Sequence, residues 1–441
     1  MDFILSKQHF LYATVLAVIF SFLVSCSNEN IVIETNESFS IQDTCSANAN
    51  HIYELYIPGN SKACSQLPLI IIIDPHGDGK SAMKRFVPAA NKYKCMLASS
   101  NLIKNNYENY LEEITVLLED VNAKYPTNGK IFLAGFSGGA RMALSFGQRN
   151  IVDGVLACGA LATTNQIITV RAPVYALIGM QDFNFIETAQ YFFRPENTPS
   201  NLRIEISEDM HEWPSSKELS DALAYLILDE NSENRKCLDK KDILKELASS
   251  KMICIEKLKK DGDFLGALQI AKNMALLHKE ENLNQFQSLQ NAIEYSPELN
   301  QEMASLRESI RFELSVRDAY MNAFMKEDLK WWKNEMTSLN KNISEDKDRF
   351  RNLAYKRIKA FLGIMCYTIT RKTLQSNDLK SAEKLLSIYK LIEPENPDMY
   401  YFYALYYSKI GKISESKSYL NKAINHGFSD KQMIKLLEIQ Y

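Results

Sequence analysis

The chain has 441 residues, which is too long for one hydrophobic core and predicts two or three domains. Its charge is nearly balanced, with 51 lysines and arginines against 54 aspartates and glutamates. The net charge of -3 therefore argues against a nucleic-acid partner.

The first 26 residues have the layout of a targeting segment. Lys7 precedes an apolar stretch from about Phe10 to Leu23, and Leu-Val-Ser then leads directly into Cys26. The stretch is short for a membrane span, which needs about 20 apolar residues, and a small residue before a cysteine suits cleavage and lipidation of that cysteine. The segment resembles a bacterial lipoprotein signal peptide, so we expect removal of residues 1–25 and a lipid on Cys26. A retained N-terminal membrane helix is the alternative.

Either outcome places the rest of the chain outside the cytoplasm, held at the outer membrane or at the periplasmic face of the bacterial cell envelope. Residues 26–49 are rich in Ser, Asn, Glu and Thr, and we expect a flexible tether there. Composition changes again after Glu230, where strand-like segments stop. The expected domains are therefore residues 50–230 and residues 231–441.

Strand-like and helix-like segments alternate in residues 50–230. The expected strands are 51–57, 67–74, 94–99, 130–136, 154–160, 173–179 and 201–207. Two of them, 67–74 and 130–136, are apolar on both faces, which is typical of central strands in a parallel sheet covered by helices on each side. The pattern predicts an α/β fold with a doubly wound, mostly parallel sheet, whose ligands bind at the carboxyl ends of the strands.

Ser137 lies at one of these carboxyl ends, in the sequence Gly135-Phe-Ser-Gly-Gly139 between a strand and a helix. So tight a turn forces the serine into strained backbone geometry with its hydroxyl exposed. Glycines are needed at Gly135 and Gly139 because side chains there would collide. The pattern predicts a nucleophile elbow.

A serine nucleophile needs a base and a carboxylate that orients the base. Four of the six histidines are unsuited, because they fall in the signal segment, at the start of a peripheral strand, or in the helical region: His9, His51, His278 and His426. Of the other two, His211 follows the strand 201–207, in a loop at the same edge as Ser137. His76 lies in a glycine-rich loop after the strand 67–74.

The acid is expected after another strand. Asp182 fits, because it lies in the turn that leaves the strand 173–179. Asp153 precedes its strand and would lie at the wrong end of the sheet. Glu187 and Asp209 are weaker alternatives.

Residues 51–230 resemble an α/β-hydrolase, with Ser137, Asp182 and His211 in that family's order of nucleophile, acid and base. The motifs Gly-Phe-Ser-Gly-Gly, Gly-Met-Gln-Asp and His-Glu-Trp-Pro are similar to those of small esterases and dienelactone-hydrolase-like enzymes. The resemblance implies an oxyanion hole with one backbone N–H from Gly77 or Asp78 and another from Gly138, while His76 positions the loop.

The resemblance further implies a serine esterase that acts on a small-molecule or polymer ester through an acyl-enzyme, without a cofactor. A peptidase resembling the prolyl-oligopeptidase catalytic domain is an alternative, although its propeller domain is lacking. A third possibility is an inactive scaffold that binds partners. Only about a dozen residues separate Ala160 from Pro173, which leaves no room for a cap, so the site should be open or covered by the second domain.

Residues 231–441 have helical spacing throughout, with a repeat at the C-terminus. Ala382, Leu386 and Tyr389 align at a 34-residue offset with Ser416, Leu420 and Ala423, and Asn377 aligns with Gly411. The period resembles a tetratricopeptide repeat, in an all-α domain with degenerate repeats. It predicts a surface for a protein or peptide partner, a lid across Ser137, or a docked stabilising appendage.

The chain has eight cysteines, and lipidation of Cys26 would leave seven without regular spacing. Three of them lie in apolar patterns and are expected to be buried thiols: Cys158, Cys254 and Cys366. No Cys-x-x-Cys or histidine-rich cluster is present, so the sequence predicts no metal site.

Overall fold

The computed structural model describes residues 37–59, 66–161, 169–228, 239–277 and 284–439. The expected signal segment, Cys26 and the proposed boundary after Glu230 lie outside these residues. In the described part of the chain, none of the helices combines the length and the apolarity needed to cross a membrane.

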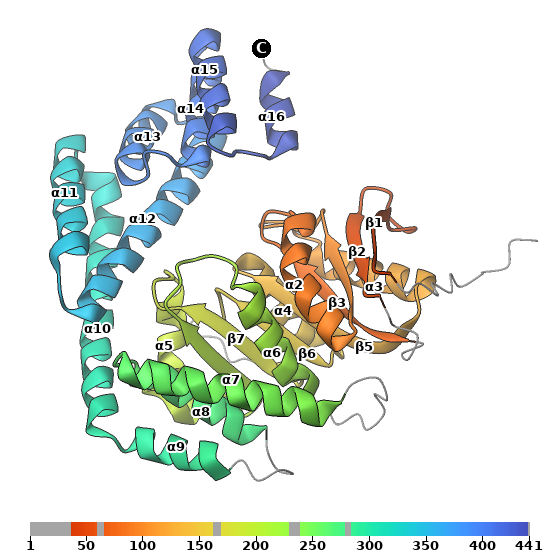
Figure 1. Ribbon diagram of the computed structural model, residues 1–441. Helices are drawn as coiled ribbons and strands as arrows, with labels where there is room; N and C mark the ends of the chain where they lie inside the picture. Colours follow the sequence, from red (N-terminus) through yellow and green to blue (C-terminus); the bar gives the residue numbers. More distant parts are fainter. Residues whose placement is uncertain (1–36, 60–65, 162–168, 229–238, 278–283, 440–441) are drawn as a thin grey trace, which may run out of the picture.

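An eight-stranded sheet forms the α/β part of the molecule (Figure 1). Its strands are β1 (Phe39–Thr44), β2 (Ile52–Ile57), β3 (Leu67–Ile73), β4 (Met96–Ser100), β5 (Thr127–Phe136), β6 (Gly154–Cys158), β7 (Val174–Gly179) and β8 (Leu202–Ser207). The spatial order is β1-β2-β4-β3-β5-β6-β7-β8. The β1–β2 and β2–β4 pairs are antiparallel and the others are parallel. The predicted mostly parallel sheet is confirmed, and each of the seven expected strands is present.

Strand β1 is a correction, because residues 39–44 were expected to belong to a flexible tether. It pairs with β2 from Phe39 opposite Ile57 to Thr44 opposite Ile52. The Asp43 carboxylate accepts hydrogen bonds from the hydroxyls of Tyr53 and Tyr125, each at 3.0 Å. Since four of its six side chains are polar, its composition is typical of a linker, and its order comes from contacts with residues distant in the sequence.

Five helices cover the sheet: α2 (Gly79–Tyr93), α3 (Tyr110–Lys124), α4 (Gly138–Arg149), α5 (Phe185–Phe193) and α6 (Ser216–Leu228). Helices α2 and α6 pack together, as do α3 and α4. The neighbouring strand residues Gly154 and Val155 point to opposite faces; Gly154 lies against Leu226 of α6 and Val155 against Gly147 of α4. Helices therefore cover both faces, and β3 is buried along its whole length because apolar layers lie on each side.

Ten helices follow among the described residues: α7 (Lys240–Lys260), α8 (Phe264–Leu276), α9 (Asn284–Glu294), α10 (Pro297–Lys326), α11 (Leu329–Glu345), α12 (Arg349–Gln375), α13 (Leu379–Ile392), α14 (Pro397–Lys409), α15 (Ile413–Asn425) and α16 (Lys431–Glu438). Helices α7 and α8 lie along the α/β part, and α10 to α16 form an arm that rises past one end of the sheet (Figure 1). An all-helical C-terminal region is thus present.

The first helices of this region share the core of the sheet. One hydrophobic cluster joins the sheet to α7, α8, α9, the first half of α10 and the start of α12, at Phe350 and Leu353. A second cluster begins at Tyr320. Lys251 of α7 is buried and bonds Glu205 of β8 at 2.6 Å and Asp221 of α6 at 3.2 Å. The change of composition at residue 230 therefore does not coincide with a break in packing.

The C-terminal helices repeat at the 34-residue offset read from the sequence. Helices α13 and α15 begin 34 residues apart, as do α14 and α16. Asn377 and Gly411, which precede α13 and α15, both have positive φ, of 60° and 75°. Each pair therefore starts with the same turn, in which a left-handed residue suits asparagine or glycine.

The expected buried thiols are only partly found. Cys158 and Cys366 are buried, and burial raises the pKa of both thiols. Cys254 is only half-buried, which corrects that expectation, while Cys45 and Cys95 are buried as well.

Candidate active site

Ser137 occupies the sharp turn between β5 and α4. Its backbone has φ 53° and ψ -117°, a conformation that L-residues rarely adopt. Its N–H donates to the carbonyl of Cys158 at 2.8 Å, which fixes the turn against β6. A Cβ on Gly135 would lie 2.3 Å from the Gly139 carbonyl oxygen, and one on Gly139 would lie 2.1 Å from that of Ile73. Both glycines are therefore required by close backbone approach, as the sequence indicated.

Three loops at the carboxyl ends of β5, β7 and β8 bring Ser137, Asp182 and His211 together. Nε2 of His211 lies 2.9 Å from Oγ of Ser137, and Nδ1 lies 2.8 Å from Oδ2 of Asp182. The Asp182 side chain is 1% exposed and that of His211 is 20% exposed. The other Asp182 oxygen accepts the N–H of Asn184 at 2.7 Å. A buried carboxylate thus orients an imidazole whose second nitrogen faces a hydroxyl, which is the order of contacts that activates a serine.

Aromatic rings hold the imidazole from two sides. The His211 ring centroid lies 4.7 Å from that of Phe136, just before Ser137, and 4.3 Å from that of Phe183, just after Asp182. The Trp213 ring also contacts that of Phe136, with centroids 5.3 Å apart and the planes tilted by 31°. These contacts restrict ring rotation, so the histidine is packed between the segments that carry its two partners.

Trp213 connects the histidine loop to the loop after β3. Its indole N–H donates to Oδ2 of Asp74 at 2.9 Å, and Oδ1 of Asp74 accepts the N–H of His76 at 2.8 Å. The sequence contained Trp213 only as part of a motif. Its position after a strand end was the signal that could have marked it as a residue of the site.

The two backbone N–H groups expected from the loop after β3 already have hydrogen-bond partners within that loop. The Gly77 N–H bonds the Asp74 carbonyl at 3.2 Å, and the Asp78 N–H bonds an Asp74 carboxylate oxygen at 3.3 Å, so this turn uses both. The Gly138 N–H, at the first position of α4, has no hydrogen-bond partner among the described residues. Gly77 and Asp78 are occupied for a local reason, because the carbonyl and the carboxylate of Asp74 accept their N–H groups within the same turn.

A loop that the sequence did not single out also reaches Gly138. A Cβ on Gly138 would lie 1.8 Å from Oδ1 of Asn105, in the loop after β4. The Asn105 N–H donates to the Pro75 carbonyl at 2.8 Å, which joins the loops after β3 and β4. The Asn105 amide therefore lies beside the candidate oxyanion donor.

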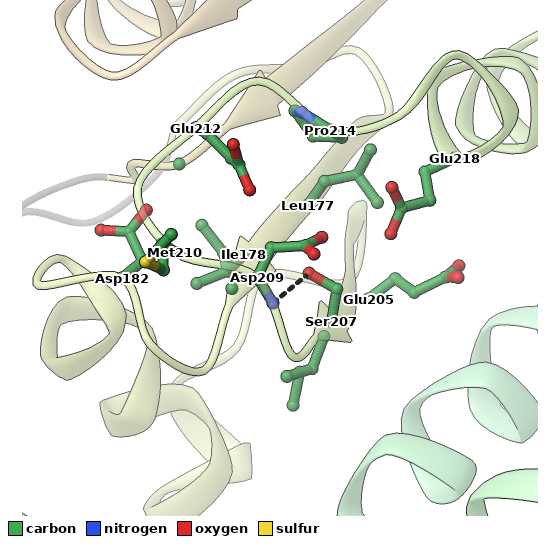
Figure 2. A pocket seen from close by; sticks show the side chains of 13 residues that line it. Leu177, Ile178, Asp182, Glu205, Ser207, Asp209, Met210, Glu212, Pro214 and Glu218 are labelled. Carbon is green, nitrogen blue, oxygen red and sulfur yellow. Dashed lines mark hydrogen bonds between the residues drawn. The ribbon is translucent and has the colours of Figure 1, made fainter. Parts of the chain in front are cut away.

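The competing acids occupy other roles. Glu187 pairs with Arg141 at 2.7 Å, and burial raises the pKa of this carboxyl against the opposing effect of the arginine. Asp153 bonds the Ile131 N–H at 2.8 Å and Lys130 at 2.9 Å, at the amino end of the sheet. Asp209 lines a small cavity together with Asp182, Glu205 and other residues from β7, β8 and the histidine loop, and Ser137 is not among the lining residues (Figure 2).

A second serine–histidine–carboxylate contact occurs elsewhere in the fold. His51 lies 2.9 Å from Oγ of Ser100 and 2.7 Å from Oε2 of Glu113. Both Ser100 and His51 are 0% exposed, and Oγ of Ser100 already accepts the N–H groups of Leu102 and Ile103. Burial lowers the pKa of His51. The distances in this cluster are those of a nucleophile site, but its serine is inaccessible to solvent and does not lie on a strained turn. The cluster instead connects the start of β2 with β4 and α3.

Within the described residues, no group of three or more histidine, cysteine, aspartate or glutamate side chains is arranged to hold a metal ion.

No family model matches the chain, and no curated protein sequence matches it. Solved structures similar to the α/β part include an esterase from Pyrococcus furiosus, at 12% identity and a TM-score of 0.34, with 43% of this chain and 91% of that chain covered. An S-formylglutathione hydrolase from Agrobacterium tumefaciens matches at 10% identity and 0.35, with 43% and 93% covered. Esterase LipW from Mycobacterium marinum matches at 15% and 0.33, with 42% and 78% covered. Sequence identities and TM-scores as low as these carry no conclusion about the function of this chain.

Proposed function

We propose that this protein is a membrane-anchored serine hydrolase that cleaves an ester through a covalent acyl-enzyme. One observation carries the proposal: a partly exposed serine on a strained strand-to-helix turn lies 2.9 Å from an imidazole that a buried carboxylate orients. Strain of about 1–3 kcal/mol at one residue persists where the surrounding structure enforces it, and such residues cluster at active sites.

The chemistry follows from these contacts. The Ser137 hydroxyl gives its proton to Nε2 of His211 while Oγ attacks the acyl carbon, and Asp182 stabilises the imidazolium. The carbonyl oxygen becomes an oxyanion that accepts the Gly138 N–H. Collapse of this intermediate expels the alcohol, which takes the proton from His211. Water then gives a proton to His211 and attacks the acyl carbon; collapse of this second intermediate breaks the bond to Oγ, releases the acid and returns the proton from His211 to Ser137. No cofactor takes part in these steps.

A fluorophosphonate probe tests the nucleophile, with purified full-length protein in detergent. Labelling should be lost in Ser137→Ala and reduced by about 1,000-fold or more in His211→Ala. Ser100→Ala is the matched control, since Ser100 has the same contact to a histidine but is fully buried. Each variant is checked by circular dichroism. Labelling that survives Ser137→Ala, or an unlabelled wild type, refutes the proposal and favours an inactive scaffold.

Ester and peptide substrates separate the two hydrolase classes. Short-chain p-nitrophenyl esters should be hydrolysed with a higher kcat/KM than prolyl peptides or their amides. Hydrolysis of the peptides alone would replace the esterase by the prolyl-oligopeptidase-like peptidase.

The anchoring proposal rests on the sequence before Cys26. Incorporation of a fatty-acid analogue should label the wild type and not Cys26→Ser, and only the wild type should fractionate with the cell envelope. Equal behaviour of the two proteins would refute lipidation.

The helical region is proposed to be tetratricopeptide-like and to restrict access to Ser137. The support is the 34-residue period of α13 to α16 and an ion pair, 3.7 Å long, between Asp430 before α16 and Lys104 in the loop after β4. Helices of the arm thus touch a loop next to the site. Polymer or protein partners would bind along this arm.

A further inference from the structure

Helices α10 and α12 bring a buried charge cluster to the turn that carries Asp182. Arg357 of α12 is 0% exposed, and its Nε donates to Oε2 of Glu313 on α10 at 2.8 Å. Glu313 is also 0% exposed, and its Oε1 pairs with Arg317 at 2.5 Å. Two arginines therefore share one buried carboxylate at the interface between the helical arm and the α/β part.

Both arginines donate to backbone carbonyls on either side of Asp182. Nη1 of Arg357 bonds the Met180 carbonyl at 2.7 Å, and Nη2 of Arg317 bonds the Phe183 carbonyl at 2.9 Å. The guanidinium of Arg357 also lies over the ring of Phe185, 5.1 Å from its centroid. The acid turn is therefore held from outside at two points.

The histidine loop has a similar contact. Nη2 of Arg349, in the first turn of α12, bonds Oε1 of Glu208 at 2.7 Å, and Glu208 lies three residues before His211. The Phe183 ring contacts the His211 ring, so the turn held by Arg317 also positions the imidazole. The helical arm thus contacts the segments of both the acid and the base.

Stability alone does not account for this cluster. Removing an ion from water costs several kcal/mol, and a buried ion pair is often no more stabilising than apolar side chains of the same volume. A guanidinium, however, has rigid, directional donors that fix a carbonyl where an apolar group cannot. Fixing the carbonyls beside Asp182 sets the direction of its carboxylate toward His211.

We infer that Arg357 and Arg317 are positioning residues of the active site, so that α10 and α12 complete the site that the α/β part begins. This inference rests on the proposed function. A displacement of about 1 Å in a catalytic group can cost on the order of 100-fold in rate. Loss of one guanidinium should therefore lower kcat for a short-chain p-nitrophenyl ester by about 10- to 100-fold and leave KM for that ester within about 2-fold of the wild-type value.

Arg357→Met is the first test, because Glu313 keeps Arg317 as a partner and no uncompensated charge is created. Arg357→Lys keeps a charge and one donor, so it should recover part of the lost rate. Arg351→Met is the matched control on the same helix, since Arg351 pairs at the surface with Glu308, at 3.7 Å. Its kcat should equal that of the wild type.

A double-mutant cycle separates positioning from folding. If Arg357 acts through the carboxylate, Arg357→Met should change kcat by less than about 3-fold in an Asp182→Asn background, where the oriented base is already lost. An equal loss in both backgrounds would show a general structural effect and overturn the inference. Circular dichroism and thermal unfolding are recorded for every variant.

The outcomes distinguish the two proposals. An unlabelled and inactive wild type refutes the proposed function and this inference with it. An active wild type with unchanged kcat in Arg357→Met refutes the inference alone. Should Arg357→Met fail to fold, Arg317→Met provides the same cycle, because Glu313 then keeps Arg357.

Discussion

At residue 137 the backbone conformation should make a glycine variant more stable toward unfolding than an alanine variant, the reverse of the order in an ordinary helix. In an ordinary helix, glycine is about 1 kcal/mol less stable than alanine. At residue 137, with φ 53° and ψ -117°, a Cβ atom costs about 1–3 kcal/mol, which glycine avoids. Glycine loses about 0.5–1 kcal/mol through the entropy of the unfolded chain. These terms leave Ser137→Gly more stable than Ser137→Ala by up to about 2.5 kcal/mol, and the preference of the N-cap position for glycine over alanine adds to the difference.

The matched control is Glu119, an exposed residue in the middle of α3. There, Glu119→Ala should be more stable than Glu119→Gly by about 1 kcal/mol. Urea titrations and thermal scans of the four proteins give the two differences, each on the order of 2 °C in Tm. Neither variant of Ser137 should react with a fluorophosphonate.

The sign of the difference decides the result. If Ser137→Ala is as stable as Ser137→Gly or more so, residue 137 does not hold a strained positive φ, and the nucleophile elbow is refuted. If both sites prefer alanine equally, no strain is stored at the turn.

Two further changes act on packing and on charge. Gly139→Ala should lower the free energy of unfolding by about 1–3 kcal/mol and slow labelling of the serine, since its Cβ would lie 2.1 Å from the Ile73 carbonyl oxygen. Gly147→Ala should cost less, because its Cβ would meet only valine methyl groups, at 3.1 Å or more; equal losses would contradict this explanation. Burial raises the pKa of Glu302 from 4.5 to about 7. Between these values the folded state holds a proton that the unfolded chain releases, so stability falls as pH rises from about 4.5 to 7. Glu302→Gln should lose this dependence and exceed the wild type at pH 8 by on the order of 2 kcal/mol in urea titrations; a retained dependence would contradict the assignment.

The apolar periodicity, and the positions of polar residues directly after strands, predicted much of the fold and of the candidate site. The apolar runs of β3 and β5 are typical of central strands, and a parallel sheet brings the residues that follow its strands to one edge. Ser137, Asp182 and His211 were identifiable for that reason, since each directly follows a strand. Asp153 was set aside by the same rule, and its contact with Ile131 lies at the other end of the sheet.

Residues whose roles depend on distant partners were missed or misassigned. Strand β1 has the composition of a linker, and it was missed because its order comes from pairing with β2 and from the two tyrosines that donate to Asp43. Either Gly77 or Asp78 was expected to donate an N–H to an oxyanion, but Asp74 accepts both N–H groups, a contact that no motif indicated. Asn105 follows β4 without any motif, and only the folded chain places it beside Gly138.

The amino-acid sequence by itself determined the α/β alternation, the elbow around Ser137 and its candidate partners, because local backbone geometry and strand order follow from short-range patterns. The tertiary structure decided which of two serine–histidine–carboxylate contacts is accessible, since Ser100 and His51 are fully buried. It also placed helices α10 and α12 of the helical arm in contact with the segments that carry Asp182 and His211. Arg357 lies 177 residues after the Met180 carbonyl that it binds, and no local pattern encodes a contact over that separation.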